Sequence, residues 1–150
     1  MKKAIKIVII ISAVILIGLW ATLKIPFAAD INQTITAHIY KDGNAVQETA
    51  VYMNGTKSNY LFADEQRFIG KFYIEYHERT GRESMHASVI FRKHGDWQGI
   101  IYYQNATFPS LGINYALLIN KEMNEFALGF EDGTIIATSD EMYQKYFENS

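Results

Sequence analysis

The stretch FIGKFYIEYHERTGRESMHASVIFR, residues 68–92, decides the fold of this chain. Apolar and polar residues alternate on both sides of residues 79–82, which is the period-two pattern of half-buried β-strands. The alternation predicts an antiparallel hairpin, because a slip of one residue would set apolar against polar positions. The expected register pairs Tyr76 with Met85, Ile74 with Ala87, and Phe72 with Val89.

Similar runs lie on both sides of this hairpin and are separated by turn residues. Asp42-Gly43 and Asp132-Gly133 predict tight turns, since both central residues must accept positive φ. Asn54-Gly55 is expected to end a strand. We expect Val89 opposite Tyr102, Phe91 opposite Ile100, Leu128 opposite Ala137, and Phe130 opposite Ile135. The fold class is therefore mainly β: an antiparallel meander of about eight strands, in a curled or barrel-like sheet.

The end of the chain predicts a short helix. Ser139 is a suitable N-cap, and Asp140 and Glu141 place negative charge in the first turn. The spacing of the residues that follow gives one apolar face, formed by Met142, Tyr143, Tyr146 and Phe147. We expect this helix to close over the sheet.

Residues 7–23 read IVIIISAVILIGLWATL and contain no charge. The length and polarity predict a transmembrane helix, here bounded as residues 7–24, because a helix satisfies its own backbone polar groups in lipid. Three lysines precede it, so residues 1–6 are expected to form a cytoplasmic tail and the rest an exported part. We expect a cell-membrane protein with a short tether at 25–33 and an extracytoplasmic β domain at 34–150. The alternative is a cleaved signal and a secreted domain.

The composition limits the classes of partner and of reaction that this chain can have. Residues 25–150 hold ten basic and sixteen acidic residues, a net charge of −6, which argues against nucleic acid as a partner. The chain has no cysteine, which excludes disulfides and thiol nucleophiles. Neither a glycine-rich phosphate loop nor a G-x-S-x-G motif is present. No cofactor is predicted, and binding is favoured over catalysis.

Two sets of side chains are candidates for a functional site. In the expected register Glu75 opposes His86 and His77 lies diagonally from it, which could form a zinc site or a proton-transfer site, or only an ordinary polar outer face. Aromatic residues around the loop 105–112 could bind an apolar ligand, or could fill the core; they are Tyr102, Tyr103, Phe108 and Tyr115.

The basic start MKKAIK and the ending DGTIIATSDEMYQKYF, on a hairpin-rich body, resemble the small membrane-anchored exported proteins of unknown function in Gram-positive bacteria. The resemblance implies an envelope location. The leading hypothesis is a single-pass membrane protein whose β domain binds an envelope protein, a cell-wall component or an apolar ligand. Alternatives are a metal-dependent hydrolase centred on Glu75, His77 and His86, or a structural subunit of an envelope complex.

Overall fold

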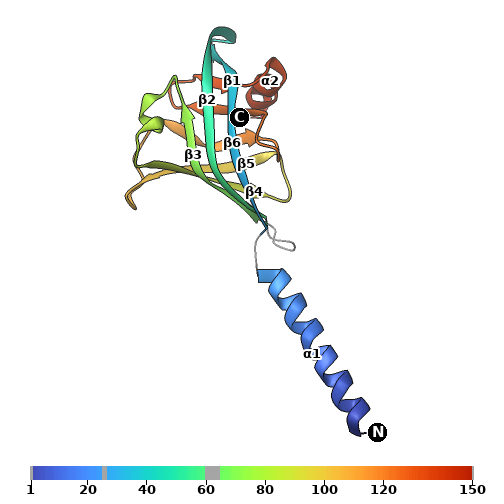
Figure 1. Ribbon diagram of the computed structural model, residues 1–150. Coiled ribbons are helices and arrows are strands. Elements are labelled where there is room, and N and C mark those ends of the chain that lie inside the picture. Colours follow the sequence, from blue (N-terminus) through green and yellow to red (C-terminus); the bar gives the residue numbers. More distant parts are fainter. Residues whose placement is uncertain (1, 25–26, 60–64, 150) are drawn as a thin grey trace.

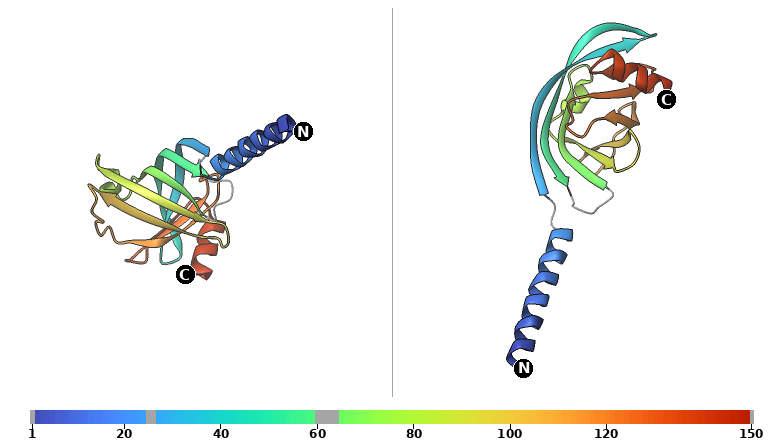
Figure 2. Two further views of the ribbon diagram at one scale, coloured as in Figure 1. Left: turned by 90° about the horizontal axis from the view of Figure 1, so that it is seen from below. Right: turned by 90° about the vertical axis from the view of Figure 1, so that its right-hand side faces the viewer.

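The computed structural model describes residues 2–24, 27–59 and 65–149 of the 150-residue chain (Figure 1). It begins with helix α1 (Lys2–Lys24), which extends away from the rest of the molecule. A β-barrel follows, with a short helix packed against its side. Figure 2 shows the same arrangement from two further directions.

Eight antiparallel strands in chain order form a closed barrel, in which β8 pairs with β1. They are β1 (Phe27–Lys41), β2 (Asn44–Asn59), β3 (Glu65–Ile74), β4 (Met85–Arg92), β5 (Trp97–Gln104), β6 (Ile113–Ile119), β7 (Phe126–Phe130) and β8 (Ile135–Ala137). The 3-10 helix η1 (Glu78–Gly81) lies between β3 and β4, and helix α2 (Asp140–Glu148) follows β8. The predicted meander of about eight strands with a C-terminal helix is confirmed, and its sheet is closed.

The interior of the barrel is a packed core. All eight strands contribute to it, and its largest fully buried side chains include Phe68, Phe72 and Phe126. Burial of each such side chain contributes about 1.5–3 kcal/mol to stability. Every second residue of β4 is buried, from Met85 to Phe91, so the inner face predicted from residues 68–92 is confirmed.

The predicted registers are wrong, although the predicted faces are right. Val89 pairs with Phe68 and not with Phe72, a shift of four residues. Val89 also pairs with Ile100 and not with Tyr102, a shift of two. Even shifts keep every apolar side chain on the inner face, so alternation cannot distinguish among them. The larger shift arises because η1 and its flanking turns make the β3–β4 connection longer than the expected four-residue turn.

Two expected boundaries differ from the structure. β1 begins at Phe27, so most of the stretch expected as a tether, 25–33, lies in a strand; residues 25 and 26 are outside the described residues. β2 continues through Asn54-Gly55, which was expected to end it. Gly55 pairs with Gly70 of β3, and a Cβ on Gly55 would lie 2.3 Å from the carbonyl oxygen of Ile69. Glycine here permits the close approach of two strands and does not mark a turn.

Helix α2 covers the outside of β7 and β8. The Ser139 side chain accepts a hydrogen bond from the backbone N–H of Met142, which confirms the predicted N-cap. Tyr143 stacks on Tyr40 at a ring separation of 4.1 Å, and Tyr146 meets Trp97 edge to face at 4.9 Å. All residues of β7 and β8 are buried as a result. Their register pairs Gly129 with Ile135, one residue away from the predicted pairing of Phe130 with Ile135.

Among the described residues, no helix combines the length and the hydropathy that a membrane crossing requires. The assignment of residues 7–24 as a transmembrane segment stays a prediction.

Candidate functional site

The three residues of the predicted metal site each have a different set of contacts. Glu75 accepts a hydrogen bond from the backbone N–H of Ala50 at 3.4 Å. The His77 Nε2 atom lies 2.7 Å from the carbonyl oxygen of Leu111, and the ring of His86 stacks on Tyr103 at 5.6 Å. In the part of the chain that the structure describes, no three His, Asp or Glu side chains are grouped to hold a metal ion.

The prediction of that site depended on the wrong register. It placed Glu75 opposite His86, but β3 ends at Ile74 and its pairing with β4 lies four residues away from the expected one. The His77 side chain instead links the β3–β4 connection to the β5–β6 loop through the carbonyl oxygen of Leu111. Its ring also packs against Phe130 of β7. The register argument that set Glu75 opposite His86 is thus removed, and the site stays a prediction.

The four aromatic residues predicted to bind a ligand divide into two groups. Tyr102 belongs to the core, where its hydroxyl donates a hydrogen bond to the carbonyl oxygen of Phe72 at 2.8 Å. Burial raises the pKa of Tyr102 well above its ordinary value. Tyr103 is half-buried on the outer face, beside His86. Tyr102 is therefore a core residue, and Tyr103 packs on a side chain of the neighbouring strand β4.

Phe108 and Tyr115 form an exposed aromatic pair. They are 73% and 74% exposed and line one hollow of about 30 Å³, together with Pro109, Leu111 and other residues of the β5–β6 loop. A hollow of this volume holds about one water molecule, so no ligand is enclosed there. Large aromatic side chains on a surface can nevertheless anchor a partner. Each ring buries a large apolar area on binding, at a small cost in conformational entropy.

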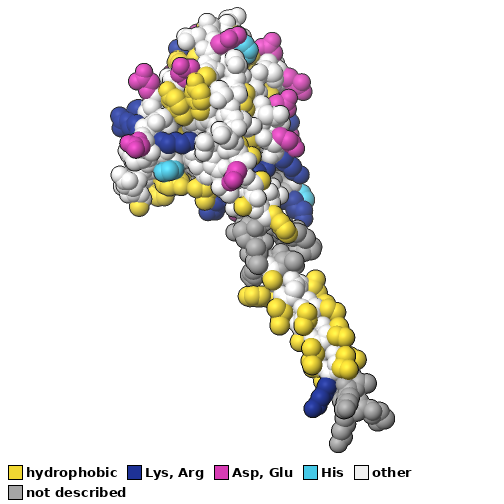
Figure 3. Space-filling view, in the orientation of Figure 1, with side chains coloured by type: hydrophobic (Ala, Val, Ile, Leu, Met, Phe, Trp, Pro, Cys, Tyr) yellow, Lys and Arg dark blue, Asp and Glu magenta, His cyan; other side chains and the backbone are white. Residues whose placement is uncertain are grey.

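A larger concavity lies at the end of the barrel where the chain arrives from α1. This polar groove has a volume of about 590 Å³ between the β4–β5 turn, the β6–β7 turn and helix α2. Figure 3 shows Lys and Arg side chains around this end of the barrel. The charged residues that line the groove are Arg92, Lys93, Asp96, Lys121, Glu125, Glu141 and Lys145. Charges of both signs nearly balance, so the groove has no strong preference for an anion or a cation.

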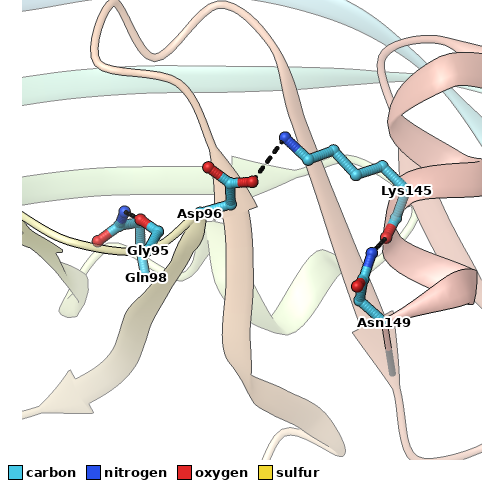
Figure 4. Close-up of polar contacts among 5 residues, drawn as sticks. All are labelled: Gly95, Asp96, Gln98, Lys145 and Asn149. Atoms are coloured by element: carbon cyan, nitrogen blue, oxygen red, sulfur yellow. Dashed lines mark hydrogen bonds and ion pairs between the residues drawn. The ribbon is translucent and has the colours of Figure 1, made fainter.

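Polar contacts fix the walls of the groove, as Figure 4 shows for one side. Lys145 of α2 forms an ion pair of 2.9 Å with Asp96 of the β4–β5 turn. The Gln98 side chain holds the same turn, since it accepts from the Arg92 N–H at 2.6 Å and donates to the Gly95 carbonyl at 3.2 Å. These bonds give the groove a defined shape.

The β6–β7 turn closes the barrel beside this groove. Met123 of the turn is fully buried, with a φ of 63°. Gln33 donates a hydrogen bond to its carbonyl oxygen at 2.8 Å, and the Lys57 ammonium donates to the carbonyl oxygen of Lys121. The Lys57 ammonium also lies 4.3 Å from the ring centre of Phe91, and burial lowers its pKa. Side chains of β1 and β2 thus hold the β6–β7 turn across this end of the barrel.

Sequence reasoning did not find the polar groove. Its residues come from three connections and one helix, and no motif joins them in sequence. Only the tertiary arrangement brings Asp96 to Lys145. Comparisons of this chain with protein-family models, with curated proteins and with solved structures found no match.

Proposed function

We propose that this protein is a membrane-anchored binding protein, in which α1 is held in a lipid bilayer and the barrel is displayed on the extracytoplasmic side. The observation that carries the proposal is the surface of α1. Twelve large apolar side chains between Ile5 and Trp20 are each 53–66% exposed, and they lie on every face of the helix. Such a surface is costly in water and favourable in lipid.

The structure of the barrel favours a partner on its outer surface over a ligand in its interior. Buried apolar side chains from all eight strands form its interior, which favours a partner on the surface over an enclosed apolar ligand. Phe108 of the β5–β6 loop and Tyr115 near the start of β6 form the exposed pair, at the end of the barrel opposite the start of β1. An envelope protein or a cell-wall glycan that stacks on these rings is the proposed class of partner.

Substitutions of valine by arginine test the anchor. Val14→Arg places a charge in the apolar surface of α1, and we expect it to move the chain from the carbonate-resistant membrane fraction to the soluble fraction. The matched control is Val46→Arg in β2, where the valine is also exposed, at 55% against 63% for Val14. Val46→Arg should leave the protein in the membrane. A parental chain found in the soluble fraction would refute the proposal.

The binding surface has a separate test. A photoreactive amino acid at position 108 or 115 should give discrete crosslinked products in intact envelopes, because both side chains are exposed and line one hollow. The control is the same group at position 46, which is also exposed but lies on the β1–β2 hairpin. Equal products from all three positions would count against a specific partner at Phe108 and Tyr115.

A further inference from the structure

A second groove lies beside helix α2, at the end of the barrel opposite the start of β1. It is bordered by α2, the β1–β2 turn and the β7–β8 turn, and its volume is about 510 Å³. Small-molecule sites have volumes of about 300–1,000 Å³, so the groove is large enough for a ligand. Figures 1 and 2 both show α2 beside the β1–β2 hairpin. This distal groove is lined by residues that include Asp42, Gly43, Gly133, Tyr143, Gln144 and Phe147.

Three stacked aromatic rings form one wall of the distal groove. The ring centres of Tyr40 and Tyr143 are 4.1 Å apart, and those of Tyr143 and Phe147 are 6.0 Å apart. Tyr40 and Tyr143 are buried, whereas Phe147 is 60% exposed. The Tyr40 hydroxyl donates a hydrogen bond to the Asp140 carboxylate at 2.5 Å, which fixes the start of α2 against β1. The stack therefore presents a flat apolar ring that the fold holds in place.

The other groups of the distal groove are polar and available to a ligand. Within the described residues the Tyr143 hydroxyl has no hydrogen-bond partner, and no buried side-chain nitrogen or oxygen atom lacks one, so this hydroxyl is open to solvent. It lies beside the β1–β2 turn, 3.9 Å from the position of a Cβ on Gly43. Asp42 accepts a hydrogen bond from Asn44 through its backbone carbonyl, which leaves its carboxylate free to bind. The Gln144 side chain is exposed.

A flat apolar ring beside a hydroxyl, a carboxylate and an amide matches the chemistry of a sugar. The C–H face of a sugar packs on an aromatic ring, whose face carries partial negative charge. Its hydroxyls donate to a carboxylate and exchange hydrogen bonds with hydroxyl and amide groups. A wholly apolar ligand would desolvate the Asp42 carboxylate without replacing its hydrogen bonds, and an anionic ligand would meet it as a like charge. The groove therefore favours a neutral polyol.

We propose that the distal groove binds a neutral glycan, with a sugar ring stacked on Phe147 and sugar hydroxyls bonded to Asp42. The groove lies next to the hollow of the exposed aromatic pair, because the β7–β8 turn contributes Gly133 to the groove and Glu131 to the hollow. A linear glycan that crosses this turn contacts both. In choosing the glycan among the partners named above, this inference rests on the proposed function.

Calorimetric titration of the full-length protein tests the groove, in a detergent that has no sugar headgroup. The neutral probes are chitotetraose and cellotetraose, and the anionic probe is tetragalacturonate. We expect at least one neutral probe to bind, and the anionic probe to bind about tenfold more weakly or not at all, because its carboxylates meet Asp42. Binding of neither neutral probe, or tighter binding of the anionic probe, would overturn the inference.

Two variants locate the binding in the groove. Phe147→Ala should weaken binding of the neutral probe by about tenfold or more, and Phe147→Trp should retain it, because the ring supplies the contact. The matched control is Phe27→Ala, which removes a ring of similar exposure, 56%, at the start of β1. Asp42→Asn keeps a residue type that accepts the positive φ of this turn, and it should reduce the preference for neutral over anionic probes.

Phe108→Ala separates this inference from the proposed function. Weaker binding in Phe147→Ala, alone or together with Phe108→Ala, supports the groove. Weaker binding in Phe108→Ala alone would assign the glycan to the exposed aromatic pair and overturn the groove, as would unchanged binding in both. Crosslinks at position 108 without any glycan binding would refute the groove and leave the proposed function standing. If Phe147→Ala lowers the melting temperature, Asp42→Asn decides, and an unchanged preference there would overturn the inference.

Discussion

Gly55 shows how one residue type can carry two different structural meanings. In sequence, Asn-Gly between two strand-like runs predicts a turn. In the structure Gly55 lies inside β2 and faces Gly70 of β3, where a Cβ on Gly70 would lie 2.3 Å from the carbonyl oxygen of Asn54. The sequence could not separate these meanings, because the need for glycine comes from a neighbouring strand. Asp42-Gly43 illustrates the other case: both residues have positive φ and form the predicted turn.

Gly55→Ala should destabilise the barrel by about 2–3 kcal/mol, since the added methyl group overlaps backbone that cannot move without breaking the β2–β3 ladder. Gly99→Ala in β5 is the matched control, because the nearest atom to its added Cβ is 3.9 Å away. Urea unfolding of both variants in detergent, followed by tryptophan fluorescence, measures the difference. A midpoint for Gly55→Ala equal to that of Gly99→Ala would contradict the close approach of the two strands.

Tyr40 makes the stability of the barrel decrease as the pH rises in the alkaline range. Burial, followed by the hydrogen bond to the Asp140 carboxylate at 2.5 Å, raises the pKa of Tyr40 to about 12. The folded protein therefore holds this proton more tightly than the unfolded chain, whose tyrosine has a pKa near 10. The resulting stability is fully present below pH 10 and is lost as the pH rises toward 12.

We expect Tyr40→Phe to flatten the decline of the melting temperature between pH 10 and pH 12. Some decline should remain, because burial also raises the pKa of Tyr102. Tyr115→Phe removes a hydroxyl from an exposed ring and should retain the parental profile. Melting temperatures followed by circular dichroism at a series of pH values give the comparison. An unchanged slope in Tyr40→Phe would show that this hydroxyl does not control the alkaline transition.

Among the elements, the strands were predictable and their registers were not. Alternation in residues 68–92 determines which side chains face inward, but a shift of two or four residues preserves the same faces. In β7 and β8 both faces are apolar, so even a shift of one residue has no sequence signature. The expected pairing of Glu75 with His86, from which the candidate site was argued, required the exact register and is not the pairing found. The exposure of Phe108 likewise depends on how the β5–β6 loop folds.

Helix α2 stabilises the barrel through its buried aromatic face more than through its ion pair. Tyr146→Ala should lower the free energy of unfolding by about 3 kcal/mol. Tyr146 is buried against Trp97, and its hydroxyl accepts a hydrogen bond from Asn114 at 3.3 Å. Lys145→Ala removes the ion pair with Asp96, whose side chains are 45% and 68% exposed, and should cost less than 1 kcal/mol. Chemical denaturation of both variants compares adjacent residues of one helix. A larger loss of unfolding free energy in Lys145→Ala than in Tyr146→Ala would contradict the greater contribution of the aromatic face.

At the scale of the whole molecule, the chain divides into an apolar helix and a packed barrel with net negative charge. The helix carries exposed apolar side chains, whereas the barrel buries its own. All sixteen acidic residues lie after α1, and the chain starts with a cluster of lysines. This distribution of charge predicts the orientation, because basic residues next to a membrane segment are retained on the cytoplasmic side.

Two single-cysteine variants test that orientation in a chain that otherwise has no thiol. Ser110→Cys lies on the exposed β5–β6 loop, and Lys3→Cys lies in the basic start of the chain. With a membrane-impermeant maleimide, we expect position 110 to react in intact cells and position 3 to react only after lysis. The exposed loop residue ensures that a lack of labelling reports the membrane barrier and not burial in the fold. Labelling of position 3 before lysis, with protection of position 110, would place the barrel in the cytoplasm and invert the proposed topology.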